Sequence, residues 1–143
     1  MASATAYNYF ASKEHLVTDV FWRRLRSLPE PDVDRSRHSS TRVSDALADV
    51  VLLVADEPEL ATACTAAMLA TDPDVKDLRE RIGGAIHQRL ARALGDGADP
   101  AALGALELAA TGALVAAGMG HLAYPELPAR LHEVAELVLD GRS

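Results

Sequence analysis

Apolar residues recur along this chain at steps of three and four, and this spacing constrains the fold more than any other feature of the sequence. The clearest run contains Val75, Leu78, Ile82, Ile86, Leu90 and Leu94. Steps of three and four place side chains on one face of an α-helix. Sustained alternation of apolar and polar residues, which indicates strands, does not occur in the sequence. The sequence therefore predicts an all-α fold.

Capping residues, prolines and glycines divide the chain into helices. Ser12 and Asp99 suit a helix N-cap, as does either Asp72 or Asp74 for the helix between them. Pro100 fits the first turn of the helix that Asp99 would cap. Pro29 and Gly95 are typical of helix ends. The expected helices cover residues 12–28, 41–56, 59–70, 72–94 and 99–122, with a polar loop over residues 29–40 and a last helix after Pro128.

Length and composition fit one compact helical body. The chain has 143 residues, 49% of them apolar, which allows a core without disulfides or metal. Its net charge of −7 disfavours nonspecific binding to nucleic acid, so any DNA contact must be local. Cys64 is the single cysteine and indicates a reducing compartment, the cytoplasm. The longest uncharged stretch, residues 108–125, is mostly Ala and Gly and contains His121, so no membrane span is expected.

The residues with catalytic or metal-binding chemistry form no recognisable site in the sequence. The histidines fall on different expected segments without ligand spacing: His15, His38, His87, His121 and His132. The sequence has no Gly-rich phosphate loop and no Gly-x-Ser-x-Gly motif, and Cys64 has no obvious base nearby. We therefore expect no enzymatic activity, no cofactor and no metal site.

The N-terminal segment carries the most specific motif. Residues 5–16 read Thr-Ala-Tyr-Asn-Tyr-Phe-Ala-Ser-Lys-Glu-His-Leu. This segment resembles the end of the DNA-binding domain of TetR/AcrR-family transcriptional regulators, where it spans the recognition helix and the start of the next helix. Ala6 departs from the family's usual large apolar residue. Alternatively, Tyr7, Tyr9 and Phe10 only form an amphipathic anchor against the next helix.

The resemblance implies that the N-terminal residues bind operator DNA. Ser3 and Ala4 would face base edges, and the remaining contacts would go to the DNA backbone from Thr5, Tyr7, Tyr9 and Lys13. In this family two helices precede the segment, and they have no counterpart in the sequence. We therefore expect DNA binding only with an intact N-terminal domain. A shortened piece, a proteolytic product and a misassigned gene start stay open as explanations.

The resemblance also implies a domain organisation. Residues 1–28 would be the remnant of the DNA-binding domain, and residues 41–143 the ligand-binding and dimerisation domain. In this family the last two long helices pair with those of a second copy, so a homodimer is expected. Small residues four apart would allow close helix packing there: Ala109, Ala113, Ala117, Gly112, Ala116 and Gly120. Alternatively, these residues pack within one subunit.

A ligand cavity is expected between the middle helices of the second domain. Its wall would be mostly apolar with a few polar groups, formed by Val50, Val54, Cys64, Thr65, Met68, Ile82, Ile86, His87, Thr111 and Met119. Such a wall suits a lipophilic small-molecule effector. Each of these residues could equally be an ordinary core residue.

The main functional hypothesis is a TetR-like transcriptional regulator, specifically a repressor. The resemblance implies that an effector tilts the helix beginning at Ser12 and thereby changes the affinity for DNA. The second hypothesis is a stand-alone helical protein that dimerises and binds a ligand without touching DNA.

Overall fold

The described part of the chain is built from α-helices joined by short turns. The computed structural model describes residues 12–141. In chain order its elements are α2 (Lys13–Arg26), α3 (Ser39–Val51), the 3₁₀ turn η1 (Leu52–Val54), α4 (Pro58–Met68), α5 (Pro73–Leu94), α6 (Pro100–Gly118), the 3₁₀ turn η2 (Tyr124–Glu126) and α7 (Leu127–Leu139). Residues 12–141 contain no strand, so the predicted all-α fold is confirmed.

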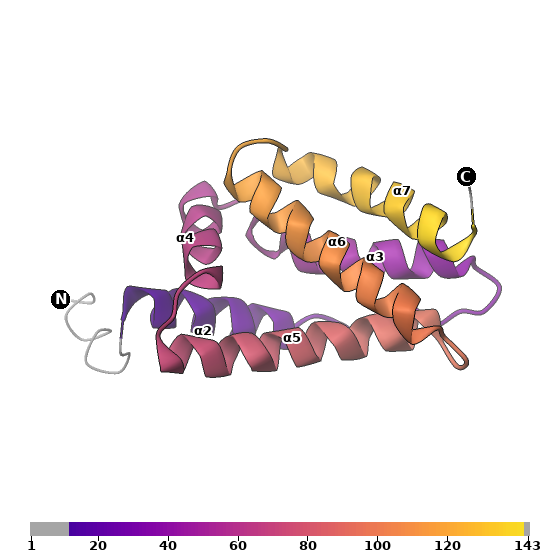
Figure 1. The fold of residues 1–143 in the computed structure, drawn as a ribbon, viewed down its shortest axis with the longest axis horizontal. Helices are drawn as coiled ribbons and strands as arrows, with labels where there is room; N and C mark the ends of the chain where they lie inside the picture. Colours follow the sequence, from indigo (N-terminus) through magenta and orange to yellow (C-terminus); the bar gives the residue numbers. More distant parts are fainter. Residues whose placement is uncertain (1–11, 142–143) are drawn as a thin grey trace.

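α3 and α5 pack against each other, and the other helices are arranged around this pair (Figure 1). α3 packs against α7 and α5, α6 packs against α7, and α2 packs against α5 and α4. α5 and α6 meet at the turn that joins them and separate toward their other ends, where α4 stands across the molecule (Figure 1). This divergence leaves the far half of α5 facing α2 and α4 instead of the main core.

Side-chain caps begin three of the helices at the predicted places. Ser12, Asp72 and Asp99 each accept a hydrogen bond from a backbone N–H of the following turn, at 3.0, 2.9 and 2.9 Å. Pro73 and Pro100 occupy the first turns of α5 and α6, where a missing N–H costs nothing. These local contacts confirm the predicted starts.

The predicted end of α6 was wrong by four residues. The helix ends at Gly118 because Gly120 adopts a left-handed φ of +82° and the N–H of His121 donates to the carbonyl of Ala116 at 2.9 Å. This pattern closes a helix C-terminus. Gly120 therefore lies outside the helix, in the turn toward α7.

The helix expected over residues 41–56 is α3 followed by η1. It begins two residues earlier than predicted, at Ser39, and its backbone tightens to 3₁₀ geometry after Val51. Tight last turns of this kind are common at helix ends. Pro58 then begins α4, one residue before the predicted start of that helix.

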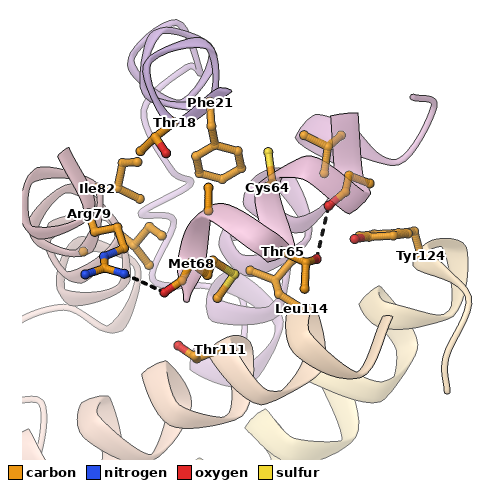
Figure 2. A pocket seen from close by; sticks show the side chains of 15 residues that line it. Thr18, Phe21, Cys64, Thr65, Met68, Arg79, Ile82, Thr111, Leu114 and Tyr124 are labelled. Carbon is orange, nitrogen blue, oxygen red and sulfur yellow. Dashed lines mark hydrogen bonds between the residues drawn. The ribbon is translucent and has the colours of Figure 1, made fainter. Parts of the chain in front are cut away.

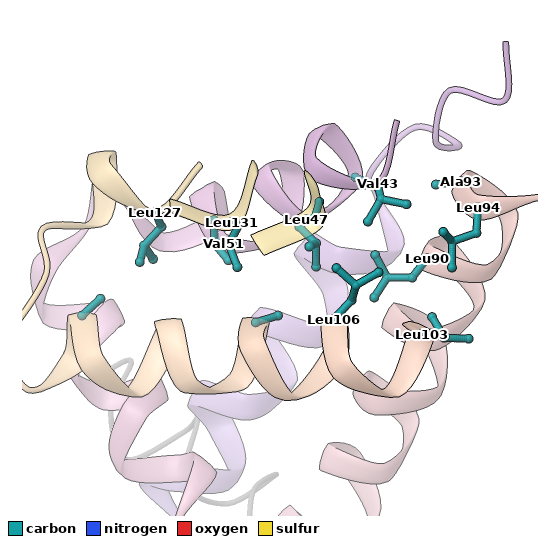
Figure 3. Close-up of a cluster of buried hydrophobic side chains, with 14 residues drawn as sticks. Val43, Leu47, Val51, Leu90, Ala93, Leu94, Leu103, Leu106, Leu127 and Leu131 are labelled. Atoms are coloured by element: carbon teal, nitrogen blue, oxygen red, sulfur yellow. The ribbon is translucent and has the colours of Figure 1, made fainter. Parts of the chain in front are cut away.

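The main core lies between α3, α5, α6 and α7 (Figure 3). Its largest buried side chains are Val43, Leu47, Val51, Leu90, Leu106, Leu127 and Leu131. From α5 the core takes the end near the turn to α6, including Leu90 and Leu94. Ile82 and Ile86, on the same predicted stripe, are only half-buried because α6 has moved away from α5 at that level.

The small residues of α6 serve packing within this chain at several positions. Ala117 is buried, and Ala109 and Ala113 pack against the core. At Gly118 an added Cβ would lie 2.1 Å from Oγ1 of Thr65, so the missing side chain lets α4 approach α6. An added Cβ at Gly112 would meet no atom within 4 Å. The intrachain alternative thus holds for part of the set, and Gly112 faces open space.

The outer surface of α6 and α7 is apolar and uncovered. Leu108, Met119 and Leu137 are 76%, 61% and 54% exposed. Among the described helices, α6 alone has the length and apolar composition that could cross a membrane, and only 22% of that window is buried. Length and composition are weak evidence for a span, because core helices of soluble proteins meet the same criteria. Exposed large apolar side chains on neighbouring helices are typical of a surface that contacts a partner.

Candidate ligand-binding cavity

A cavity of about 310 Å³ lies where α2, α4, α5 and α6 face one another (Figure 2). Cys64 and Met68 of α4, Ile82 of α5 and Leu114 of α6 line it together, and its surface is mostly apolar. The cavity exists because α4 stands where α6 has separated from α5. Its volume is at the lower end of the range for small-molecule sites.

Most of the residues predicted to bind a ligand line this cavity. They are Val54, Cys64, Thr65, Met68, Ile82, Ile86 and Thr111. They come from η1, α4, α5 and α6, so residues far apart in sequence meet at one wall. The structure therefore brings these residues together, which makes the cavity a candidate site.

Val50 and His87 line a second cavity of about 400 Å³ instead. The two cavities share wall residues of α5 and α6, among them Gly83 and Thr111. Nδ1 of His87 lies 2.6 Å from Oε1 of Glu107, so the pair joins α5 to α6 beside the second cavity. His87 is therefore engaged in a contact between helices.

The remaining predicted residues lie away from both cavities. Met119 follows the last residue of α6 and is 61% exposed, because the turn at Gly120 directs the chain toward α7. Lys13 is the exposed first residue of α2. The other predicted DNA contacts lie outside the described residues: Ser3, Ala4, Thr5, Tyr7 and Tyr9.

Several cavity residues were not predicted from the sequence. Thr18 and Phe21 of α2, Arg79 of α5 and Tyr124 of η2 all line the cavity. Arg79 stands three residues before Ile82, so the helical spacing of α5 could have revealed it. The others depend on how α2 and the turn before α7 pack, for which the sequence has no local signal.

The threonine hydroxyls of the cavity already donate hydrogen bonds within their own helices. Thr18, Thr65 and Thr111 each donate Oγ1–H to the carbonyl four residues earlier in its own helix, at 2.7, 3.1 and 3.0 Å. Their oxygens can still accept hydrogen bonds. These residues consequently offer a ligand acceptors more than donors.

The Cys64 thiol is neutral at physiological pH. Partial burial in the cavity wall raises the pKa of Cys64 to about 11, and the nearby charge of Arg24 offsets this only in part. The thiolate is the reactive form of cysteine, so this thiol is a weak nucleophile. It contributes apolar surface and a weak hydrogen bond.

Outside the cavity, one row of side chains has the composition of a catalytic triad. Oγ of Ser44 lies 2.9 Å from Nδ1 of His132, and Nε2 of His132 lies 3.4 Å from Oε1 of Glu136. Ser44 is only 5% exposed, lines neither cavity and donates its hydroxyl to the carbonyl of Thr41. A substrate could not reach this oxygen, so the row is a packing contact between α3 and α7. Within residues 12–141, no group of three His, Cys, Asp or Glu side chains could hold a metal ion.

Comparison with solved structures identifies the fold. A TetR transcriptional regulator from Rhodococcus sp. RHA1 matches with a TM-score of 0.72 and 21% sequence identity, covering 98% of this chain and 80% of that chain. The fold is therefore that of a TetR regulator, as the resemblance of residues 5–16 predicted.

Comparison with curated proteins identifies the family. Uncharacterized HTH-type transcriptional regulators from Mycobacterium tuberculosis and Mycobacterium bovis are 46% identical over 143 residues, which is 99% of this chain and 67% of each relative. No model of a known protein family matches the sequence. The chain belongs to this family of HTH-type transcriptional regulators.

Proposed function

We propose that this chain is the ligand-binding and dimerising part of a transcriptional repressor that acts as a homodimer in the cytoplasm. Residues 41–143 bind the effector and pair with a second copy, and residues 1–28 connect this part to operator DNA. The effector is a lipophilic small molecule held in the cavity between α2, α4, α5 and α6. When it binds, the affinity for DNA falls.

The observation that carries the proposal is that α2 forms part of the cavity wall. Thr18 and Phe21 line the cavity from α2, the helix that directly follows the proposed DNA-binding residues. A ligand in the cavity therefore contacts the element that leads to DNA. It shifts the position of α2 by as much as its affinity differs between the two positions.

The anchoring of α2 determines which end can move. Near its C-terminus, Arg24 donates from Nη1 to the carbonyl of Leu53 at 3.0 Å and pairs through Nη2 with Oε1 of Glu57 at 2.7 Å. The cavity residues Thr18 and Phe21 lie on the N-terminal side of this anchor. Pressure from a ligand thus pivots the N-terminal end of α2, the end that carries Lys13 and the DNA-binding segment.

The partner of the apolar surface on α6 and α7 is a second copy of this chain. Five exposed positions form a stripe at helical spacing along α6 and the residue that follows it: Ala101, Ala105, Leu108, Gly112 and Met119. The small residues in this stripe allow two helices to approach closely, and the adjoining α7 adds Leu137 as a larger contact. A bundle of four helices would cover the surface.

The coupling between cavity and α2 can be tested on this chain through its single tryptophan. Trp22 stands beside Phe21 on α2, and the guanidinium carbon of Arg26 lies 5.7 Å from the centre of its ring. Titration with decanol should change the Trp22 emission saturably. A Leu114→Phe variant, which fills part of the cavity, should lose the response. Calorimetric binding of decanol with unchanged Trp22 emission would contradict the coupling.

Regulation is tested with the DNA upstream of the gene. A gel-shift titration should detect binding by the gene product extended with any in-frame codons upstream of Met1, and a cavity ligand should weaken it. An extended protein that ignores this DNA would favour the stand-alone dimerising protein.

A further inference from the structure

We infer that the cavity selects apolar ligands that carry a single anionic head group, and that Arg79 binds this group. The inference rests on the proposed ligand-binding function of the cavity and names the chemical class of its ligand.

Arg79 is held in a defined position at the cavity wall. Its Nη1 donates to the carbonyls of Met68 and Ala70, at 2.8 and 2.6 Å, where α4 ends (Figure 2). These two contacts occupy one of the three guanidinium nitrogens. Nε and Nη2 make no hydrogen bond within residues 12–141, and Arg79 is among the residues that line the cavity, so both nitrogens keep their capacity to donate.

The charge of Arg79 has no carboxylate partner in the described part of the chain. The acidic neighbours on α5 pair with other residues, Glu80 with Lys76 and Asp77 with Arg81. None of the residues that line the cavity is Asp or Glu. A ligand carboxylate at this wall would form charge-assisted hydrogen bonds with the guanidinium, whereas a cationic ligand would meet repulsion without compensation.

The rest of the cavity suits an apolar body. Arg79 and Tyr124 lie at opposite ends of the view in Figure 2, with Met68 and Leu114 between them. The threonine hydroxyls donate their hydrogens to carbonyls of their own helices, so they donate none to the head group and Arg79 has no competition from them. A ligand would therefore lie with its head at Arg79 and its apolar part toward Leu114 and Tyr124.

Arg79 could alternatively serve only to hold the end of α4. The two roles differ in one measurable respect. A purely structural Arg79 affects all ligands of equal size alike, whereas an anion-binding Arg79 affects only those with a negative head group. The discriminating quantity is the ratio of affinities for two ligands that share one apolar chain.

The experiment compares decanoate, decanol and decyltrimethylammonium by isothermal titration calorimetry, below their micelle-forming concentrations. Decanoate should bind about tenfold or more tightly than decanol, as expected for charge-assisted hydrogen bonds, and decyltrimethylammonium should bind most weakly. Arg79→Gln should reduce the decanoate-to-decanol ratio to about one, and Arg79→Lys should keep part of it. Arg81→Gln removes a charge from the same helix outside the cavity and should leave the ratio unchanged.

Two outcomes would overturn the inference in distinguishable ways. Equal affinity for decanoate and decanol, or an Arg79→Gln variant that weakens both equally, refutes anion selection while the proposed ligand cavity stands. If no probe binds to the unmodified chain, both the anion selection and the ligand-binding function are wrong.

Discussion

At the residue scale, Arg42 shows how a charged side chain can organise the interior. It is 4% exposed and donates to the carbonyls of Ala93 and Leu94 at the end of α5, at 2.8 and 3.2 Å. A third guanidinium nitrogen donates to the carbonyl of Arg37 in the loop before α3. These contacts satisfy the free carbonyls at a helix end and tie the loop to the core.

Replacement of Arg42 by Met should therefore be strongly destabilising. Several buried carbonyls would lose their donor, and we expect a loss of about 3 kcal/mol in the free energy of unfolding, measured by urea denaturation. Arg130→Met is the matched control, since the pair that Arg130 forms within residues 12–141 is an exposed one with Glu133, and its effect should stay within about 0.5 kcal/mol. Similar losses for both variants would contradict this role of Arg42.

The raised pKa of Cys64 predicts slow alkylation. At pH 8 a thiol with a pKa of about 11 has roughly one hundredth of the thiolate of a thiol at the ordinary value of 9.0. The rate with iodoacetamide should rise about tenfold per pH unit from pH 8 to 10, and it should fall further when decanol fills the cavity. Because the unfolded chain ionises first, this thiol's contribution to stability is complete below pH 9 and declines as the pH rises toward 11. A rate equal to that of free glutathione at pH 8 would show that the thiol is not buried.

At the element scale, contacts within one turn were predictable and contacts between helices were not. The N-caps at Ser12, Asp72 and Asp99 involve groups two or three residues apart, so the sequence signal was sufficient. The end of α6 was predicted too late because apolar residues continue to residue 122. The left-handed turn at Gly120 overrides that pattern.

The glycines of α6 should respond to substitution with opposite signs. At Gly118 a Cβ would lie 2.1 Å from Oγ1 and 2.7 Å from Cβ of Thr65, so rotation of the threonine cannot relieve the clash, and Gly118→Ala should cost about 1–3 kcal/mol. At Gly104 a Cβ meets no atom within 4 Å, and Gly104→Ala should add about 0.5–1 kcal/mol. Urea denaturation of both variants measures the difference. If Gly118→Ala stabilises the protein as Gly104→Ala does, α4 and α6 are farther apart than described.

At the scale of the whole molecule, the uncovered apolar surface of α6 and α7 is the feature that bears most on association with a second copy. Helix α6 is apolar over most of its circumference and only 22% of its apolar window is buried, which is typical of a helix that contacts a partner.

A double variant tests this arrangement. Leu108→Glu with Leu137→Glu would place four carboxylates in the proposed interface of the dimer, and sedimentation equilibrium should detect a monomer whose helical circular dichroism is unchanged. Leu69→Glu is the control, because Leu69 is 73% exposed at the end of α4 and belongs to neither α6 nor α7, and this variant should remain dimeric. A double variant that still dimerises would show that the dimer interface lies elsewhere on the chain.

The sequence by itself determined the properties that depend on neighbouring residues. Helical spacing, caps and proline positions act within one or two turns, and they predicted the all-α fold and the starts of the helices that a side chain caps. The motif of residues 5–16 indicated the TetR-type fold. Helical spacing also placed most of the predicted ligand-binding residues at the cavity, because the half-buried positions of α4 and α5 follow the helical period.

Only the tertiary structure decided which of these positions line a cavity and which fill the core. Along α5, Leu90 is buried by α6, while Ile82 faces the cavity because α6 has diverged and α4 stands in its place. Phe21 and Tyr124 reach the cavity through the packing of α2 and of the turn before α7. The angle between two helices depends on packing along their whole lengths, and no short sequence window contains that information.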